Sequence, residues 1–250
     1  NSPSIMTTTT KNNIHTARRT TANRKRIPDT SEEKSTREMI LRQALELINT
    51  RGMVDFRIDT LASSLGLSPG NITYHFSRKE EICTALWEQY LSEYRAIERS
   101  LTTLFDLKQF YLLNRIGLRL NYKYRGVLVF RGSDVGAIAR DREAGRSNEA
   151  EHAAISRRIL GLLGRNGYLN DRTTDQITEG IHTYHYIASQ WGVNFAYQTY
   201  APEEVESKLD YLALLSIHAL YPTLSAKGQK EFGEILDRVT SGNLLEGEPA

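Results

Sequence analysis

Cysteine is nearly absent from this chain. Cys83 is the only one among 250 residues, which excludes an intramolecular disulfide framework. A chain of this length can bury a full hydrophobic core without disulfides or metals, and such cysteine usage is typical of a reducing compartment. Long apolar runs are also missing, because stretches such as residues 211–215 fall far short of the roughly 18 residues that span a bilayer. Residues 1–30 lack the apolar segment of a secretory signal. We therefore expect a cytoplasmic globular protein with no membrane partner.

Acidic residues are absent from the start of the chain, although the net charge of the whole is only +2. Residues 1–28 carry six lysines and arginines and no acid, so their charge is +6 and residues 29–250 are left with −4. Two interpretations remain open for this arm: it binds a polyanion, or it is a disordered tail that happens to be basic.

Apolar spacing and turn residues predict three helices within residues 32–77. The first carries an apolar face and is expected to end at Gly52, and the second is broken by Gly66. Ser68 followed by Pro69 is a strong start signal for the third. Two helices joined by a short glycine-containing turn form a helix-turn-helix. A capping box of Ser77 and Glu80 is expected to open a fourth helix of about six turns.

The rest of the chain also has a helical pattern. No stretch alternates convincingly, although residues 126–131 could be mistaken for a strand. Residues 177–195 and 205–219 have heptad-like apolar spacing, which favours a helical bundle. We therefore expect an all-α protein. Its expected parts are a basic arm (1–30), a helix-turn-helix domain (31–82), a helical ligand-binding and dimerisation domain (83–241) and a frayed tail (242–250).

The motifs between Thr36 and Ile82 resemble the DNA-binding domain of TetR-type (TetR/AcrR) transcriptional regulators. The matching residues are Gly52, then Leu61-Ala62-x-x-Leu65-Gly66-Leu67-Ser68-x-Gly70, then His75-Phe76-x-x-Lys79 before a long helix. The resemblance implies a homodimer that places the helix after Ser68 in the major groove of double-stranded operator DNA. It also implies that a small molecule, bound by the C-terminal domain, releases the DNA. Many members are repressors.

Nine residues are the expected DNA-binding set: Arg57, Ser68, Pro69, Gly70, Asn71, Thr73, Tyr74, His75 and Lys79. Asn71 is suited to reading a base, and His75 and Lys79 to gripping the backbone, whereas Tyr74 suits either role. The chain departs from the family pattern at two positions, with Thr73 where a tyrosine is common and Arg57 where a threonine is common. Residues 36–82 have no net charge, so affinity must come from the arm, from specific contacts or from both.

Aromatic and polar residues of the second domain are candidates for the effector site. The expected set is Tyr111, Asn121, Tyr122, Phe130, His182 and Tyr186. The alternative function is a helical-bundle metal-binding protein or enzyme that uses Glu179, His182 and His185. On a helix, Glu179 and His185 are six residues apart and therefore lie on diverging faces. Common catalytic motifs are missing from the sequence. We expect a protein without enzymatic activity, without catalytic residues and without a cofactor or metal.

Overall fold

The computed structural model describes residues 31–133, 142–184, 188 and 199–242, and these residues form an all-α protein. Within these ranges no strand occurs, and Leu169 and Leu224 form one isolated antiparallel bridge. The helices are α1 (Ser31–Asp55), α2 (Ile58–Leu65), α3 (Pro69–His75), α4 (Lys79–Arg99), α5 (Leu107–Lys123), α6 (Arg125–Ser133), α8 (Arg142–Arg165), α10 (Pro202–Leu220) and α11 (Ala226–Thr240). Residues 175–184 are helical as well. None of the described helices is long and apolar enough to cross a membrane.

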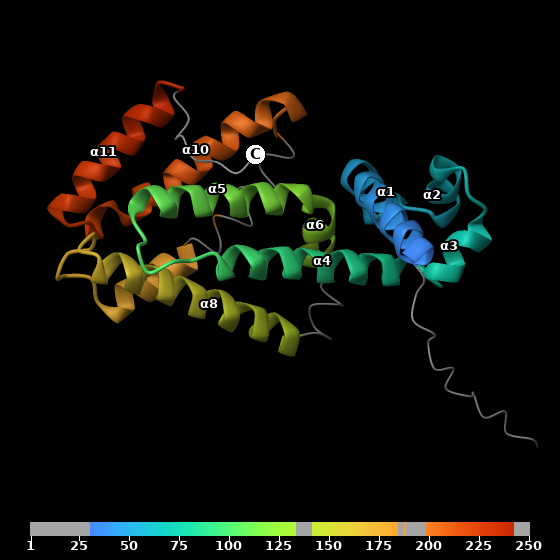
Figure 1. Cartoon of the computed structure of the whole chain (residues 1–250), viewed down its shortest axis with the longest axis horizontal. Coiled ribbons are helices and arrows are strands. Elements are labelled where there is room, and N and C mark those ends of the chain that lie inside the picture. Colours follow the sequence, from blue (N-terminus) through green and yellow to red (C-terminus); the bar gives the residue numbers. More distant parts are fainter. Residues whose placement is uncertain (1–30, 134–141, 185–187, 189–198, 243–250) are drawn as a thin grey trace, which may run out of the picture.

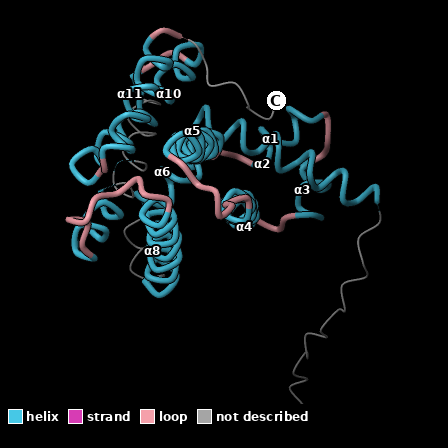
Figure 2. Tube along the Cα trace, turned by 60° about the vertical axis from the view of Figure 1, so that its left-hand side comes forward, coloured by secondary structure: helices cyan, strands magenta, loops and turns pink. Residues whose placement is uncertain are grey.

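Helices α4 and α5 run side by side along the length of the molecule (Figure 1). The first three helices lie at one end of this pair, and α8, α10 and α11 lie around the other end (Figures 1 and 2). With 21 residues, α4 spans about 30 Å and reaches from the first group of helices to the second. It is therefore a continuous connection between them.

Two hydrophobic cores follow from this arrangement. The C-terminal core draws on α5, α8, α10 and α11. The N-terminal core combines α1 to α3 with the first half of α4, and it also contains Leu120 of α5, Val127 of α6 and Tyr124 between these two helices. The expected domain boundary at residue 82 thus falls inside α4, and residues more than thirty positions further along complete the N-terminal core.

The turn signals around the helix-turn-helix act as expected. At Gly52 the backbone leaves the helical conformation with φ 76°, and Gly66 ends α2 with φ 67°. Both angles lie in the left-handed region that glycine adopts without strain. Ser68 caps α3, since its side chain accepts a hydrogen bond from the amide of Asn71, and Pro69 is the first helical residue.

The predicted capping box at Ser77 and Glu80 is wrong. Helix α4 begins at Lys79 with Arg78 as its N-cap, so Ser77 lies one residue too early to cap it. The amide and hydroxyl of Ser77 donate instead to the carboxylate of Glu81, at 3.0 and 2.7 Å. These two bonds, and Arg78 beside them, lower the pKa of the Glu81 carboxyl.

The apolar residues of the heptad-like series at 205–219 pack inside the protomer. Val205 and Leu209 are 2% and 1% exposed and belong to the C-terminal core, and Leu212 packs against it. The series at 177–195 lies mostly outside the described residues. Residues 126–131 are helical, as part of α6.

Candidate functional site

Helix α3 presents a polar, solvent-facing surface. Ile72 is fully buried in the N-terminal core, and this anchors the short helix against α1 and α2. The five other residues from Ser68 to Thr73 are exposed: Ser68, Pro69, Gly70, Asn71 and Thr73. The Asn71 Oδ1 accepts a hydrogen bond from the Ser68 hydroxyl at 3.2 Å. The cap therefore orients the side chain that is best suited to a base contact.

Tyr74 is the most exposed aromatic residue of the N-terminal domain, with 74% of its surface accessible. Its hydroxyl donates to Glu33 Oε1 at 2.9 Å, and its ring meets the His75 ring edge-on at 5.1 Å. The contact with Glu33 ties the end of α3 to the first turn of α1. Sequence reasoning did not include Glu33, because the two residues lie 41 positions apart.

Arg57 and Lys79 are the two cations of the expected DNA-binding set that lie outside α3. Arg57 is exposed and stands at the N-cap of α2 without a capping side-chain bond, while its guanidinium donates to the Val54 carbonyl at 3.4 Å. The Lys79 ammonium donates to the Met53 carbonyl at 3.3 Å. Lys79 therefore ties the start of α4 to the end of α1, in addition to any contact it makes with a phosphate.

A cavity of about 180 Å³ lies in the C-terminal domain between α4, α5, α8, α10 and the residues Ile181, His182, Tyr184 and Ala188. Most of its wall is apolar. The polar side chains on the wall are Tyr90, Tyr94, Glu98, Asn114, Asn121, Ser156, His182, Tyr184 and Ser216. No lysine or arginine lines the described part of this cavity. An apolar space with a few polar groups is the usual form of a small-molecule site.

Of the six residues expected at the effector site, the structure brings Asn121 and His182 together on the cavity wall. Tyr111 lies in the C-terminal core, where burial and the nearby Asp210 raise its pKa to about 12. The Tyr122 ring lies under the guanidinium of Arg125 at 4.3 Å, and Phe130 packs against the N-terminal core. None of these three is among the residues that line the cavity, and Tyr186 lies outside the described residues.

Sequence reasoning missed Tyr90 and Tyr94, which lie one turn apart on α4 and face the cavity. The Tyr90 hydroxyl donates to Asn121 Oδ1 at 2.9 Å. The apolar stripe of the fourth helix contained the signal, since aromatic residues four apart share a helix face. The sequence does not show which face of α5 packs against this stripe.

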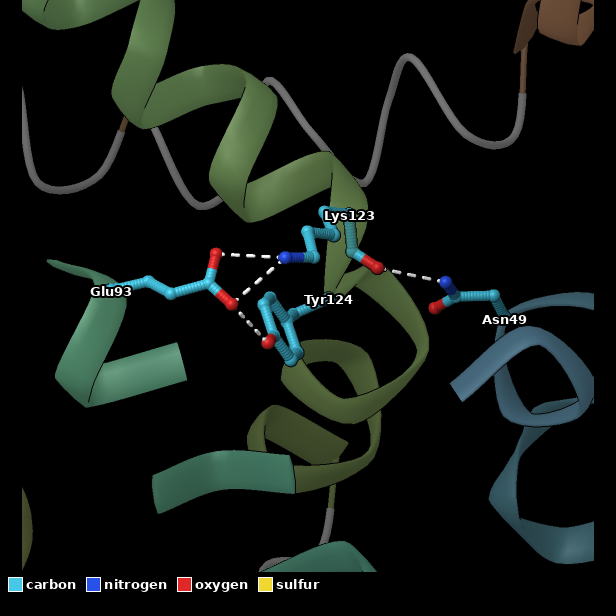
Figure 3. A network of polar contacts seen from close by, with 4 residues as sticks. All are labelled: Asn49, Glu93, Lys123 and Tyr124. Atoms are coloured by element: carbon cyan, nitrogen blue, oxygen red, sulfur yellow. Dashed lines mark hydrogen bonds and ion pairs between the residues drawn. The ribbon is translucent and has the colours of Figure 1, made fainter. Parts of the chain in front are cut away.

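A network of polar contacts joins α1 to the C-terminal end of α5 (Figure 3). The side-chain amide of Asn49 donates to the Lys123 carbonyl at 2.8 Å, and its Oδ1 accepts from the Gly126 amide at 2.9 Å. The Glu93 carboxylate accepts from the Lys123 ammonium at 2.8 Å and from the Tyr124 hydroxyl at 2.7 Å. Burial, followed by the bond to Glu93, raises the pKa of Tyr124. The N-terminal domain is thus fastened to α5 and α6 as well as to α4.

The metal-site alternative gains no support from the described residues. Glu179 is exposed and pairs with Arg157 at 3.4 Å, whereas His182 is 4% exposed and its Nδ1 lies 2.9 Å from the Ser156 hydroxyl. His185 lies outside the described residues. Within the described part of the chain, no group of three or more histidine, cysteine or acidic side chains is placed to hold a metal ion.

The fold and the exposed α3 define a helix-turn-helix protein with a second, helical domain. Residues 40–86 match the family model described as bacterial regulatory proteins, tetR family. Over these residues the match confirms the resemblance to TetR-type transcriptional regulators. The comparison with curated proteins gives no match.

Several solved structures share the fold over most of the chain. A TetR-family transcriptional regulator from Marinobacter aquaeolei VT8 has a TM-score of 0.71 at 18% identity, covering 82% of this chain and 98% of that one. The ketosteroid transcriptional regulator KstR2 of Mycobacterium tuberculosis has a TM-score of 0.55 at 14% identity, covering 76% and 95%. A gamma-butyrolactone receptor, described as ArpA-like, has a TM-score of 0.53 at 17% identity, covering 84% and 98%.

Proposed function

We propose that this chain is a sequence-specific transcriptional regulator, acting as a homodimeric repressor that a small molecule releases from DNA. The observation that carries the proposal is the exposed face of α3, held in place by the buried Ile72 and by the Ser68 cap. A short helix anchored on one side and polar on the other is the form in which helix-turn-helix proteins read the major groove.

The roles within the DNA-binding set follow from position. Asn71 reads a base, because its side chain is exposed near the start of α3, and an asparagine can make two hydrogen bonds to adenine. His75 at the end of α3, Arg57 at the start of α2 and Lys79 at the start of α4 grip the phosphate backbone. Tyr74 turns its hydroxyl toward Glu33 in the free protein, so a phosphate contact by Tyr74 requires that bond to open.

The cavity is the proposed effector site. Two of the proteins that share the fold are described as a ketosteroid regulator and a gamma-butyrolactone receptor, which supports a small-molecule role for this domain. The proposed partner in the homodimer is a second copy of the chain. Tyr211, on α10, leaves 56% of its surface exposed and is a candidate contact for that copy.

A physical connection supports communication between the cavity and α1. Tyr90, on the cavity wall, packs edge-on against the Tyr124 ring with centroids 5.7 Å apart. Tyr124 follows Lys123, whose carbonyl holds Asn49 of α1. An effector that binds beside Tyr90 therefore contacts a residue of the joint that sets the position of the helix-turn-helix.

Selection of bound duplexes from a pool of random DNA tests the proposed function. We expect enrichment of a site made of two inverted half-sites, because a two-fold symmetric dimer presents two copies of α3. The control is the same pool carried through the rounds without protein. A final pool that does not differ from this control would overturn the proposal.

A further inference from the structure

The polar groups of the cavity wall identify the kind of molecule that the cavity accepts. Charged ligands have poor partners there, because no lysine or arginine lines its described part. The carboxylate of Glu98 lies 4.0 Å from the Arg158 guanidinium, and its side chain keeps 27% of its surface exposed. Burial of an ion without an opposite charge is costly, so an anion is disfavoured outright and a cation must compete with Arg158.

Asn121 provides an unused hydrogen-bond donor. It is 6% exposed, and its Oδ1 is engaged by the Tyr90 hydroxyl, which fixes the orientation of the amide group. Its Nδ2 has no hydrogen-bond partner among the described residues, and the residue lines the cavity. An amide donor on an apolar cavity wall is stabilised by an acceptor.

Asn114 differs from Asn121 although both line the cavity from α5. The Nδ2 of Asn114 donates to the Phe110 carbonyl of its own helix at 2.7 Å. The side-chain donor of Asn114 is therefore used within the protein, whereas the side-chain donor of Asn121 is available to a ligand. The two residues are seven apart and lie on one face of α5, about 10 Å from each other along the axis.

Gly117 makes room for the ligand between these two asparagines. It lines the cavity, and a Cβ added there would meet no atom within 4 Å. A larger side chain at this position would therefore occupy the cavity without pressing on the protein. The cavity volume of about 180 Å³ suits a small molecule, since an engineered apolar cavity of about 150 Å³ holds benzene.

We infer that the cavity takes a small, uncharged, mainly apolar ligand whose carbonyl or equivalent acceptor binds the Nδ2 of Asn121. Tyr90 is a positioning residue, because its hydroxyl holds the Asn121 amide in the orientation that offers this donor. The inference rests on the proposed function and specifies the chemistry of its effector site.

Three eight-carbon probes test this ligand class by titration calorimetry in the absence of DNA: 2-octanone, octanoate and octylammonium. We expect 2-octanone to bind at least about tenfold more tightly than either ion, because its head group can be buried without an unpaired charge. Asn121→Leu should weaken 2-octanone binding by about three- to tenfold, the range for one lost hydrogen bond. The matched Asn114→Leu, on the same wall but with its donor already bonded to Phe110, should weaken 2-octanone binding less than Asn121→Leu does. Circular dichroism verifies that each variant is folded.

A second pair of variants locates the binding. Gly117→Leu should abolish 2-octanone binding, whereas Gly233→Leu, at an open position on α11 away from the cavity, should not affect it. Tighter binding of octanoate or octylammonium, lost in Gly117→Leu, would overturn the ligand class and leave the effector site in place. Binding that survives Gly117→Leu would instead refute the cavity as the effector site. Failure of 2-octanone to bind the wild-type chain would overturn the inference, whatever the outcome of the DNA selection.

Discussion

Asp210→Ala is expected to lower the free energy of unfolding by about 3 kcal/mol, at the lower end of the range for breaking a buried ion pair. The side chain of Arg115 on α5 is 4% exposed, and its guanidinium donates to the carboxylate of Asp210 on α10. Removal of the carboxylate takes the Asp210 contact away from a buried cation. We expect a cost at the lower end of that range because 18% of the Asp210 side-chain surface is exposed. Urea denaturation followed by circular dichroism measures the change.

Two further variants separate the ion pair from general effects of substitution. The double variant Arg115→Met/Asp210→Leu should recover most of the lost stability, because no charge remains to be buried. Glu179→Ala removes the carboxylate of an ion pair whose two side chains are more than half exposed, and it should change stability by less than about 1 kcal/mol. If Asp210→Ala unfolded at the wild-type urea concentration, the pair would not contribute to holding α5 and α10 together.

Gly126→Ala is expected to destabilise the joint between the two domains by about 2 kcal/mol, a typical cost of overpacking. A Cβ at this position would lie 2.5 Å from the Ile48 carbonyl oxygen and 3.0 Å from the Asn49 amide nitrogen. Both are backbone atoms of α1, so no side-chain rotation relieves the contact. Helix α6 must then move away from α1, which also weakens the bond from the Gly126 amide to Asn49.

Gly117→Ala is the matched control, because it makes the same substitution where the added methyl group meets open space. Alanine favours the helix over glycine, so this variant should be as stable as the wild type or more stable by up to about 1 kcal/mol. Thermal and urea unfolding of both variants give the comparison. Equal stability of Gly126→Ala and Gly117→Ala would show that α1 and α6 are not in close contact in solution.

The helix-turn-helix could be predicted from sequence because local residues define it. Gly66 supplies a left-handed turn, and Ser68 and Pro69 start the next helix, so each signal acts within a few residues of the structure it sets. The predicted capping box was wrong although it rested on the same kind of local signal. Ser77 and Glu80 have the right spacing, but the start of α4 is shifted toward Lys79 and the carboxylate of Glu81 receives the bonds.

The effector cavity depends on contacts between residues that are distant in the sequence. Asn121 and His182 were identifiable as polar residues on helices, but their convergence depends on how α5 packs against its neighbours. Tyr111 and Tyr122 belong to the same helix as Asn121 and yet do not line the cavity, because the faces of α5 meet different partners. Periodicity identifies a buried face without naming the helix that covers it.

The same limit applies to the joint between the domains. Asn49 and Lys123 lie 74 residues apart, and nothing near either residue indicates the contact. Gly126 is equally uninformative in sequence, since a glycine within an apolar stretch also fits a strand or a bend. Only the approach of α1 shows that a Cβ there would meet backbone atoms.

The most direct test of the account is the affinity of the wild type and of Asn71→Ala for a selected operator and for a scrambled duplex of the same length. We predict that Asn71→Ala loses about 1–3 kcal/mol on the operator and little on the scrambled duplex, because it removes a contact to one base. Lys79→Ala serves as the comparison and should weaken both duplexes alike, as the loss of a phosphate contact does. An equal loss on both duplexes for Asn71→Ala would contradict the claim that α3 reads DNA sequence.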